Sequence, residues 1–355
     1  MSAQALRADR LPLDRVAVEE LGPGLEPTWD AFVAESPDGS PFHRLGWRRA
    51  IEAAFRQRPF YLVARRGTRI AGVLPLFRAP VLFSGHALVS VPFAIRGGAL
   101  ADDAEVAEAL LAAAVDCARE RRARHVELRS AVDRFSSLPP REGYVTFRAD
   151  LGLSEGALLR RMDRKRRQML NHAARAGYSV SEVGTDRLPL FYDLFARSMR
   201  RHGTPVLPRR FVQAVARELP GVVRLFLLEH GGRPVMSVLA LADGGVLMPF
   251  WAGRADRHRA AEELLYWEMM RWGRERGFHT FDFGRSRRGT GAAAFKARWG
   301  MEEVPLDYRV VPVRGHEAPR VDPGNPRFAP LIAVWRRLPL ALTRRLGPPL
   351  AGRIP

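Results

Sequence analysis

An internal repeat constrains the fold of this 355-residue chain more than any other feature of its sequence. Residues 60–77 show the pattern of strand, glycine turn and strand, and residues 224–242 repeat it. In both halves a helix followed by a short strand comes next, at 108–130 and 261–286. Because the two similarities occur in the same order at a nearly constant offset, we predict that the chain contains a duplicated mixed α/β unit.

The remaining elements fit two such units in tandem. Helical segments open each half, and the second half has a third strand, a short helix and a final strand. A strongly basic helix separates the halves. The opening helical segments are expected at 29–55 and 188–217. In the second half the third strand is expected at 245–252, the short helix at 292–299 and the final strand at 304–313. The basic helix is expected at 158–176. We therefore predict a first domain over 1–150, a second over 151–318 that carries the active cleft, and a basic, proline-rich tail over 319–355.

The composition, 46% hydrophobic and 27% charged, is typical of a soluble globular protein. The one cysteine, Cys117, excludes a disulfide framework and a cysteine-rich metal site. The histidines show no metal-ligand spacing. No apolar signal-peptide core follows the first residue, and the most apolar stretch, 79–95, is too short and polar to span a bilayer. We expect a cytoplasmic protein without a metal.

The formal charge of +19 has two explanations, which the sequence leaves open. One is a genome that encodes arginine liberally; the other is an anionic partner such as tRNA, a nucleotide donor or anionic lipid. Only two of the 57 basic residues are lysines, Lys165 and Lys296. The compact ammonium of lysine is not interchangeable with a guanidinium, so these two positions are candidates for function.

The loop that follows the strand at 279–283 is the richest candidate for chemistry. It combines glycines and arginines ahead of the helix that carries Lys296, an arrangement suited to holding an anion. Its candidate residues are Arg285, Ser286, Arg288 and Gly289. Asp282 alternates with two phenylalanines and so points to the opposite face of the strand, where it either orients an amine or forms a structural ion pair with Arg285.

A second candidate region surrounds the start of the helix expected at 256–276. The loop at 253–259 brings glycine and arginines to this helix start, where it either binds phosphate or is simply capped by Asp256. The substrate- or donor-binding candidates here are Gly253, Arg254, Trp251, Tyr266 and Lys165.

The stretch 328–346 in the tail is apolar and arginine-bearing, and Pro339 interrupts it. Two interpretations stay open: a tail that packs on the body, and a tail that docks peripherally on an anionic membrane surface.

Taken together, several motifs resemble the FemAB-like branch of the GNAT acyltransferase superfamily, and most closely its exosortase/PEP-CTERM-associated bacterial members. The motifs, which run from Trp29 to the tail, are Ser36-Pro37, Phe42-His43, Trp47, Ser90-Val91-Pro92-Phe93, Gly97-Gly98, Arg164-Lys165-Arg166-Arg167, Gly203-Thr204-Pro205, Tyr266-Trp267-Glu268, Phe281 to Ser286, Gly289-Thr290-Gly291, Phe295-Lys296 and Trp299-Gly300. The resemblance implies two tandem GNAT-like domains and a lysine near the transferred acyl group, which corresponds to Lys296. It also implies a role in exopolysaccharide or cell-envelope biosynthesis.

We therefore expect an N-acyltransferase of class EC 2.3, with acyl-CoA or aminoacyl-tRNA as donor and no tightly bound cofactor. The acceptor would be an amine on a small molecule, saccharide or peptide. Lys296 would stabilise the oxyanion or leaving group, Asp282 would orient or deprotonate the amine, and Arg285 and Arg288 would hold phosphate. The alternatives are a peptidoglycan-type transferase that requires aminoacyl-tRNA, a non-catalytic polyanion-binding protein and a membrane-surface scaffold.

Overall fold

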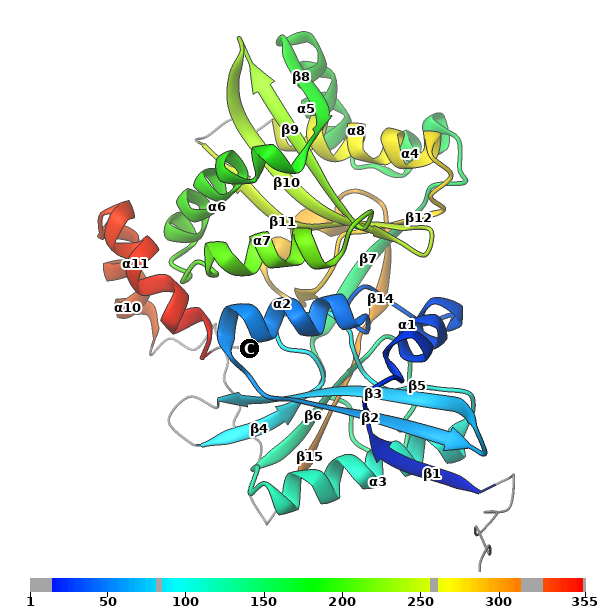
Figure 1. Cartoon of the computed structure of the whole chain (residues 1–355). Helices are drawn as coiled ribbons and strands as arrows, with labels where there is room; N and C mark the ends of the chain where they lie inside the picture. The colour runs from blue at the N-terminus through cyan, green and yellow to red at the C-terminus, as the bar shows by residue number, and fades with distance from the viewer. Residues whose placement is uncertain (1–14, 81–84, 256–260, 314–327, 354–355) are drawn as a thin grey trace, which may run out of the picture.

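Two β-sheets, one above the other in Figure 1, form the framework of the molecule. The computed structural model describes residues 15–80, 85–255, 261–313 and 328–353. The first sheet contains β1 (Val16–Glu20), β2 (Pro59–Arg66), β3 (Arg69–Pro80), β4 (His86–Val89), β5 (Leu100–Ala101), β6 (His125–Ser130) and β15 (Asp307–Pro312). Its order is β1–β2–β3–β4–β6–β15, and β5 pairs with β3.

The second sheet contains β7 (Tyr144–Asp150), β8 (Tyr178–Val183), β9 (Val223–His230), β10 (Arg233–Asp243), β11 (Val246–Arg254), β12 (Thr280–Asp282), β13 (Ser286–Arg287) and β14 (Glu302–Pro305). Its order is β13–β7–β12–β11–β10–β9–β8, and β14 pairs with β7.

The predicted duplication is confirmed strand by strand. β1 to β4 form an antiparallel series that β8 to β11 repeat. In each sheet the next strand is parallel to the last of the series: β6 to β4, and β12 to β11. The helices α3 (Ala104–Glu120) and α8 (Ala261–Glu275) make the two crossovers that parallel pairing requires. Glu127 on β6 and Asp282 on β12 occupy corresponding strands of the two sheets.

The two sheets exchange their last strands. β7 precedes residue 150, yet it lies beside β12 in the second sheet. β15 follows the second unit in the chain and returns to lie beside β6 in the first sheet. The domain boundary predicted at residue 150 therefore does not separate the two sheets, because β7 and β15 each pair in the sheet of the other half.

Two predicted elements are each split in the structure. The strand expected at 304–313 is wrong as a single strand, because β14 pairs in the second sheet and β15 in the first. The basic helix expected at 158–176 is two helices, α4 (Glu155–Arg161) and α5 (Arg164–Arg175). Asp163 causes the break: its side chain accepts a hydrogen bond from the backbone N–H of Lys165 at 2.6 Å and so caps a new helix.

Helices cover the sheets and also fill the space between them. The remaining helices of the two units are α1 (Glu26–Glu35), α2 (Leu45–Phe55), the short 3₁₀ helix η1 (Thr185–Arg187), α6 (Leu188–His202), α7 (Arg209–Glu218) and α9 (Gly291–Ala297). In Figure 1, α2 and α7 lie side by side between the sheets, and α3 covers the far face of the first sheet. The largest hydrophobic core lies at this junction, where Trp47 packs edge-on against Phe211 and Phe250. Cys117 is buried under α3 among other apolar side chains.

Two further helices, α10 (Ala329–Arg337) and α11 (Leu340–Ala351), form the described part of the tail. They pack against α6: Arg200 donates to the carbonyl oxygen of Leu338 at 3.1 Å, and Arg344 pairs with Asp193. None of the helices in the described ranges is long and apolar enough to cross a membrane. The predicted tail over 319–355 thus packs on the body in its described part, while 319–327 lie outside the described residues.

Candidate active site in the second unit

Lys296 is held between α9 and the end of β12. Thr290 caps α9 by accepting a hydrogen bond from the N–H of Ala293 at 3.3 Å, and this places Lys296 near the last turn. The Nζ atom donates to the carbonyl oxygens of Phe283 (2.7 Å), Gly284 (2.8 Å) and Arg285 (3.3 Å). Burial lowers the pKa of this ammonium to about 8, and the carboxylate of Asp282 opposes that shift. The structure therefore places a desolvated positive charge at the end of β12.

Asp282 is buried on the face of β12 opposite Phe281 and Phe283, as strand alternation predicts. Its carboxylate accepts hydrogen bonds from the hydroxyl of Thr146, from Nε of Arg148 at 3.0 Å and from the N–H of Gly284 at 2.8 Å. Both side-chain donors come from β7, the exchanged strand. The ion-pair partner is thus Arg148 and not Arg285, and the carboxylate fixes the turn whose carbonyl oxygens hold Lys296.

A cleft of about 440 Å³, which we call the inter-unit cleft, lies between the two units. The segment between α1 and α2 forms one wall, and the β10–β11 turn with the start of β12 forms the other. Three arginines line it: Arg44, Arg96 and Arg148. Arg44 is paired with Asp243 at 2.6 Å, and Arg148 with Asp282.

Arg96 differs from the other two arginines, because its buried Nε has no hydrogen-bond partner among the described residues. Burial lowers the pKa of this guanidinium, and the nearby charge of Asp282 opposes the shift. A buried cation without a paired carboxylate is unfavourable on its own and is therefore suited to a ligand that brings a negative charge.

The loop at 90–98 fixes Arg96 in this position. The hydroxyl of Tyr308 donates to the carbonyl oxygen of Ile95, and the N–H groups of Gly97 and Gly98 both donate to the carbonyl oxygen of Arg129 at 2.8 Å. Val91 and Phe93 adopt positive φ angles of 58° and 62°. Such conformations cost about 1–3 kcal/mol each and persist where the surroundings impose them, often at functional sites.

A second cavity, of about 330 Å³, opens beside the start of α8, and we call it the α8 cavity. Its lining residues are Asp163, Lys165, Arg166, Met169, Arg254, Glu262, Glu263, Phe295 and Arg298. The cavity therefore brings together Lys165 and Arg254, two of the predicted donor-binding residues. Arg254 pairs with Glu262 at 3.1 Å, and burial raises the pKa of that carboxyl group. Residues 256–259 of the predicted phosphate loop lie outside the described residues.

Lys296 lines neither of these two cavities, but neighbouring residues relate it to both. Phe295, its neighbour on α9, forms part of the α8 cavity, while Asp282 connects it to Arg148 of the inter-unit cleft. Tyr266 packs edge-on against Phe283 with ring centroids 5.0 Å apart, and it also contacts Phe295. Burial raises the pKa of Tyr266, with the charge of Glu262 acting in the same direction.

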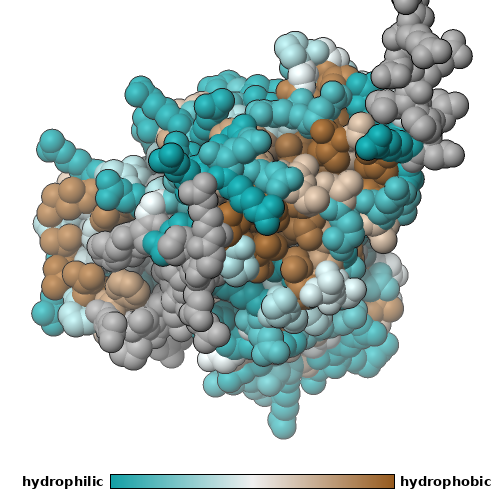
Figure 2. Space-filling model, turned by 90° about the horizontal axis from the view of Figure 1, so that it is seen from below, coloured by the Kyte–Doolittle hydropathy of each residue, from teal (hydrophilic) through white to brown (hydrophobic). Residues whose placement is uncertain are grey.

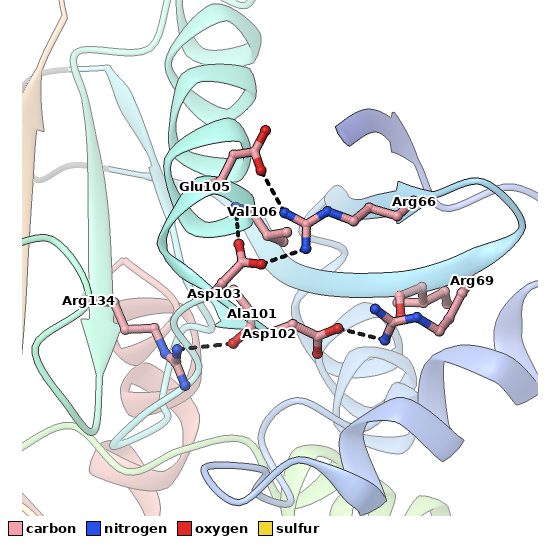
Figure 3. A network of polar contacts seen from close by, with 9 residues as sticks. Arg66, Arg69, Ala101, Asp102, Asp103, Glu105, Val106 and Arg134 are labelled. Atoms are coloured by element: carbon pink, nitrogen blue, oxygen red, sulfur yellow. Dashed lines mark hydrogen bonds and ion pairs between the residues drawn. The ribbon is translucent and has the colours of Figure 1, made fainter. Parts of the chain in front are cut away.

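The corresponding helix start in the first unit is occupied by acidic side chains (Figure 3). The N-terminus of α3 is capped by Asp103, which accepts from the N–H of Val106 at 3.0 Å. Arg66 binds Asp103 at 2.5 Å and Glu105 at 2.6 Å, and Arg69 binds Asp102 at 2.6 Å. The helix start of the first unit is thus closed by ion pairs between these carboxylates and two arginines.

Four predicted residues of the loop at 285–289 have other surroundings. The guanidinium of Arg285 lies over the ring of Tyr144, 5.7 Å from its centroid, and Arg288 forms an exposed ion pair with Glu303 at 2.8 Å. Ser286 is buried in β13, and its hydroxyl has no partner among the described residues. Gly289 provides a positive φ of 76° in the turn before α9.

Two other predicted residues lie in the packing between α6 and β11. Trp251 packs against Phe195 and Phe211 in the aromatic core. Gly253 allows α6 to approach β11, because a Cβ at this position would meet the backbone nitrogen of Phe195 at 2.3 Å.

Sequence patterns did not indicate four of the residues that line these cavities: the three arginines of the inter-unit cleft and Glu262. In a chain with so many arginines, none of the three stands out by type. A usable signal for Arg96 was its position just before the Gly97-Gly98 pair, because paired glycines often mark a close backbone approach. No group of three or more His, Cys, Asp and Glu side chains that could hold a metal ion occurs within the described ranges.

Comparison with known proteins agrees with this geometry. Residues 157–297 match the family model described as "Acetyltransferase (GNAT) domain", a segment that includes both α8 and Lys296. No curated protein matches the sequence.

Among solved structures, FemX is similar with a TM-score of 0.67, 15% identity and coverage of 83% of this chain and 97% of that one. L-PGS from Bacillus licheniformis has a TM-score of 0.53 at 13% identity, covering 90% and 97% of the two chains. A tandem GNAT protein from the clavulanic acid biosynthesis pathway has a TM-score of 0.51 at 14% identity, covering 85% and 100%. At these identities the likeness establishes the fold. The chain is a tandem GNAT-fold protein, and residues 157–297 of its second unit match the model of a GNAT acetyltransferase domain.

Proposed function

We propose that this protein transfers an acyl group from an activated donor to an amine, at the end of β12 in the second unit. The observation that carries the proposal is the half-buried ammonium of Lys296, whose neighbours Phe295 and Asp282 relate it to two cavities lined by cationic side chains. Preorganised charge in a water-poor site is the means by which enzymes stabilise the oxyanion of acyl transfer.

In the proposed reaction the amine nitrogen attacks the donor carbonyl carbon, the new C–N bond forms and the bond to the leaving group breaks. Lys296 stabilises the developing oxyanion. Its longest hydrogen bond, 3.3 Å to the carbonyl oxygen of Arg285, is the one that an oxyanion replaces at least cost. Asp282 acts as a positioning residue, because its carboxylate accepts from the N–H of Gly284 in the turn at 283–285 and is itself held by Thr146 and Arg148 of β7. Glu262, whose pKa is raised by burial, lines the α8 cavity and is the proton acceptor that we propose for an amine that reaches from the inter-unit cleft into this cavity.

We assign the donor to the α8 cavity. Lys165, Arg254 and Arg298 give it cationic side chains, which suit the phosphates of acyl-CoA or the backbone of an aminoacyl-tRNA. The GNAT domain match favours an acyl thioester. Two structural neighbours, FemX and the C-terminal domain of a putative lysylphosphatidylglycerol synthetase, support an aminoacyl donor as the second candidate.

We assign the amine acceptor to the inter-unit cleft, where Arg96 meets a negative group that the acceptor carries. The resemblance to exosortase-associated proteins points to an amino sugar or a lipid-linked saccharide of the bacterial envelope or exopolysaccharide. We propose accordingly that the acyl transfer belongs to class EC 2.3 and takes place in the cytoplasm.

A thermal-shift series identifies the donor. Acyl-CoAs, UDP-sugars and charged tRNA are compared, since a ligand that binds the native state raises the melting temperature by mass action. We expect an acyl-CoA to stabilise the protein, and less so when Arg254 is changed to Gln. Loss of activity on ribonuclease treatment of a lysate assay would instead identify aminoacyl-tRNA as the donor.

Substitution of Lys296 tests the mechanism. We expect Lys296→Met to lower kcat by about 10²–10³, the usual effect of removing one oxyanion donor. Arg288→Gln is the matched control, because Arg288 comes from the same loop but forms only an exposed ion pair. Wild-type turnover by both Lys296→Met and Lys296→Arg would contradict the proposal.

A further inference from the structure

Helices α10 and α11 carry most of the large apolar side chains that the described residues expose. Six such side chains are exposed, and five belong to these two helices: Leu331, Val334, Leu342, Leu346 and Leu350. On α11 the three leucines recur every fourth residue, and on α10 the two residues are three apart, so each set forms a stripe along one helix face.

The contacts of α11 with the body fix the direction of this stripe. Thr343, Gly347 and Ala351 are buried, and they too recur every fourth residue. A Cβ on Gly347 would lie 2.9 Å from the backbone nitrogen of Val206, so the helix approaches the body closely here. Since one face of α11 is committed to this packing, the adjacent leucine stripe stays exposed.

The same element is strongly basic. Residues 328–353 contain five arginines and no acidic residue. Three of them, Arg336, Arg337 and Arg345, are exposed next to the apolar stripes. In Figure 2 hydrophobic and hydrophilic atoms are interspersed at the left edge, the side on which Figure 1 places α10 and α11.

A groove of about 620 Å³ runs beside α11 and is lined by four arginines: Arg209, Arg210, Arg344 and Arg353. Arg344 is paired with Asp193, and Arg210 donates to the carbonyl oxygen of Ala54 at 2.8 Å. Arg209 and Arg353 have no ion-pair partner in the part of the chain that the structure describes. The groove therefore offers two guanidinium groups without an ion-pair partner among the described residues, and it borders α11, the helix that carries the three exposed leucines.

We propose that α10 and α11 dock on an anionic phospholipid surface. The leucines enter the boundary between headgroups and acyl chains, and the groove beside α11 takes a lipid phosphate between Arg209 and Arg353. Apolar side chains flanked by arginines match this surface in both layers, because the acyl chains exclude water and the headgroups carry the opposite charge. The absence of acidic residues from 328–353 favours this occupant over a protein of mixed charge.

Sedimentation with vesicles tests the proposal on the full chain. Phosphatidylcholine vesicles with and without phosphatidylglycerol are compared at low and high salt. We expect binding only with phosphatidylglycerol and weaker binding at high salt. Arg345→Gln with Arg353→Gln should weaken binding by roughly tenfold or more, since each arginine contributes about 1 kcal/mol at such a surface. Leu342→Asp with Leu346→Asp should abolish it.

Controls separate this effect from charge loss and misfolding. Arg175→Gln with Arg233→Gln removes two exposed charges of the second unit, on α5 and β10, and should bind like the wild type. Leu331→Ser with Val334→Ser tests the stripe on the other helix if the aspartate variant proves unstable. Equal binding to neutral vesicles, or undiminished binding by the leucine variants, overturns the proposal. The proposal is also overturned if the protein does not bind vesicles but self-associates, and the leucine variants abolish that self-association. The occupant is then a second copy of the chain.

Discussion

At the scale of single residues, Lys296 keeps its charge at neutral pH although its surroundings disfavour the charged form. Burial lowers its pKa from 10.5 to about 8, a shift that corresponds to about 3 kcal/mol. Three carbonyl oxygens and the field of Asp282 keep the ammonium form available at neutral pH.

A pH profile of turnover follows from this pKa. If the ammonium stabilises the oxyanion, kcat should fall as pH rises through about 8, because the neutral amine has no charge to offer. A steady-state profile from pH 6 to 10 with saturating donor measures this. In Lys296→Arg, whose group stays charged throughout, any residual activity should show no fall near pH 8. A rate that rises through pH 8 would mean that Lys296 acts as a base.

His43 supplies a prediction about stability. Ser40 and Gly98 hold the ring in the core, and burial lowers its pKa from 6.5 to about 3. The folded protein thus binds fewer protons than the unfolded chain between these values, so the stability that His43 contributes is lost as pH falls below about 6.5. Urea unfolding at pH 7 and pH 5 measures the loss, which should be smaller in His43→Asn.

Candidate site residues that the sequence indicates differ from those that only the structure shows: the first stand out by local pattern, the second by their burial in the folded protein. Lys296 and Asp282 could be found because a rare lysine follows a polar residue set between two phenylalanines, all within one short segment. Arg96 could not be found in this way, because what distinguishes it is burial without a partner, and that arises only when both units have folded around it.

At the scale of elements, the loop at 90–98 holds the guanidinium of Arg96, whose Nε has no hydrogen-bond partner among the described residues. We expect Arg96→Gln to leave the melting temperature unchanged or raise it, because a buried unpaired charge is removed. The same variant should raise KM for the acceptor and leave KM for the donor unaltered. Calorimetry and steady-state kinetics measure the two effects. A clear loss of stability would show that Arg96 has a structural role instead.

The packing of α6 on β11 gives a second prediction at this scale. Gly253→Ala should lower the free energy of unfolding by roughly 1–3 kcal/mol, since the new methyl group would meet the backbone of Phe195. Gly289→Ala is the contrasting variant. No atom lies near its added Cβ, so its effect comes only from the positive φ. Denaturant titrations of both variants check this, and equal stability of Gly253→Ala and the wild type would contradict the role assigned to Gly253.

The elements themselves were predictable where one local pattern determines them. The two hairpins and the two long helices have clear periodicity, and they lie close to the predicted ranges. The segment at 302–312 looks like one strand from its sequence, because local pattern does not show that the chain crosses from one sheet to the other at Leu306. Only long-range pairing with β7 and β6 decides this.

At the scale of the whole molecule, the exchange of β7 and β15 makes the two units depend on each other. A chain that ends at residue 313 keeps both sheets and should fold, whereas a chain that ends at residue 305 leaves β6 without its neighbour. We expect the shorter chain to aggregate, because an exposed sheet edge pairs with other molecules. Size-exclusion chromatography compares the two, and a monomeric, cooperatively unfolding 1–305 chain would show that the exchange is dispensable.

The exchange of strands also affects how the protein is made. While the ribosome is still adding residues 131–306, the nascent chain already contains β1 to β6 but not the strand that completes their sheet. At ordinary rates of synthesis this interval lasts on the order of ten seconds or more. Throughout that time the edge of β6 is open, so the first half of the protein is the part that a chaperone has most reason to protect.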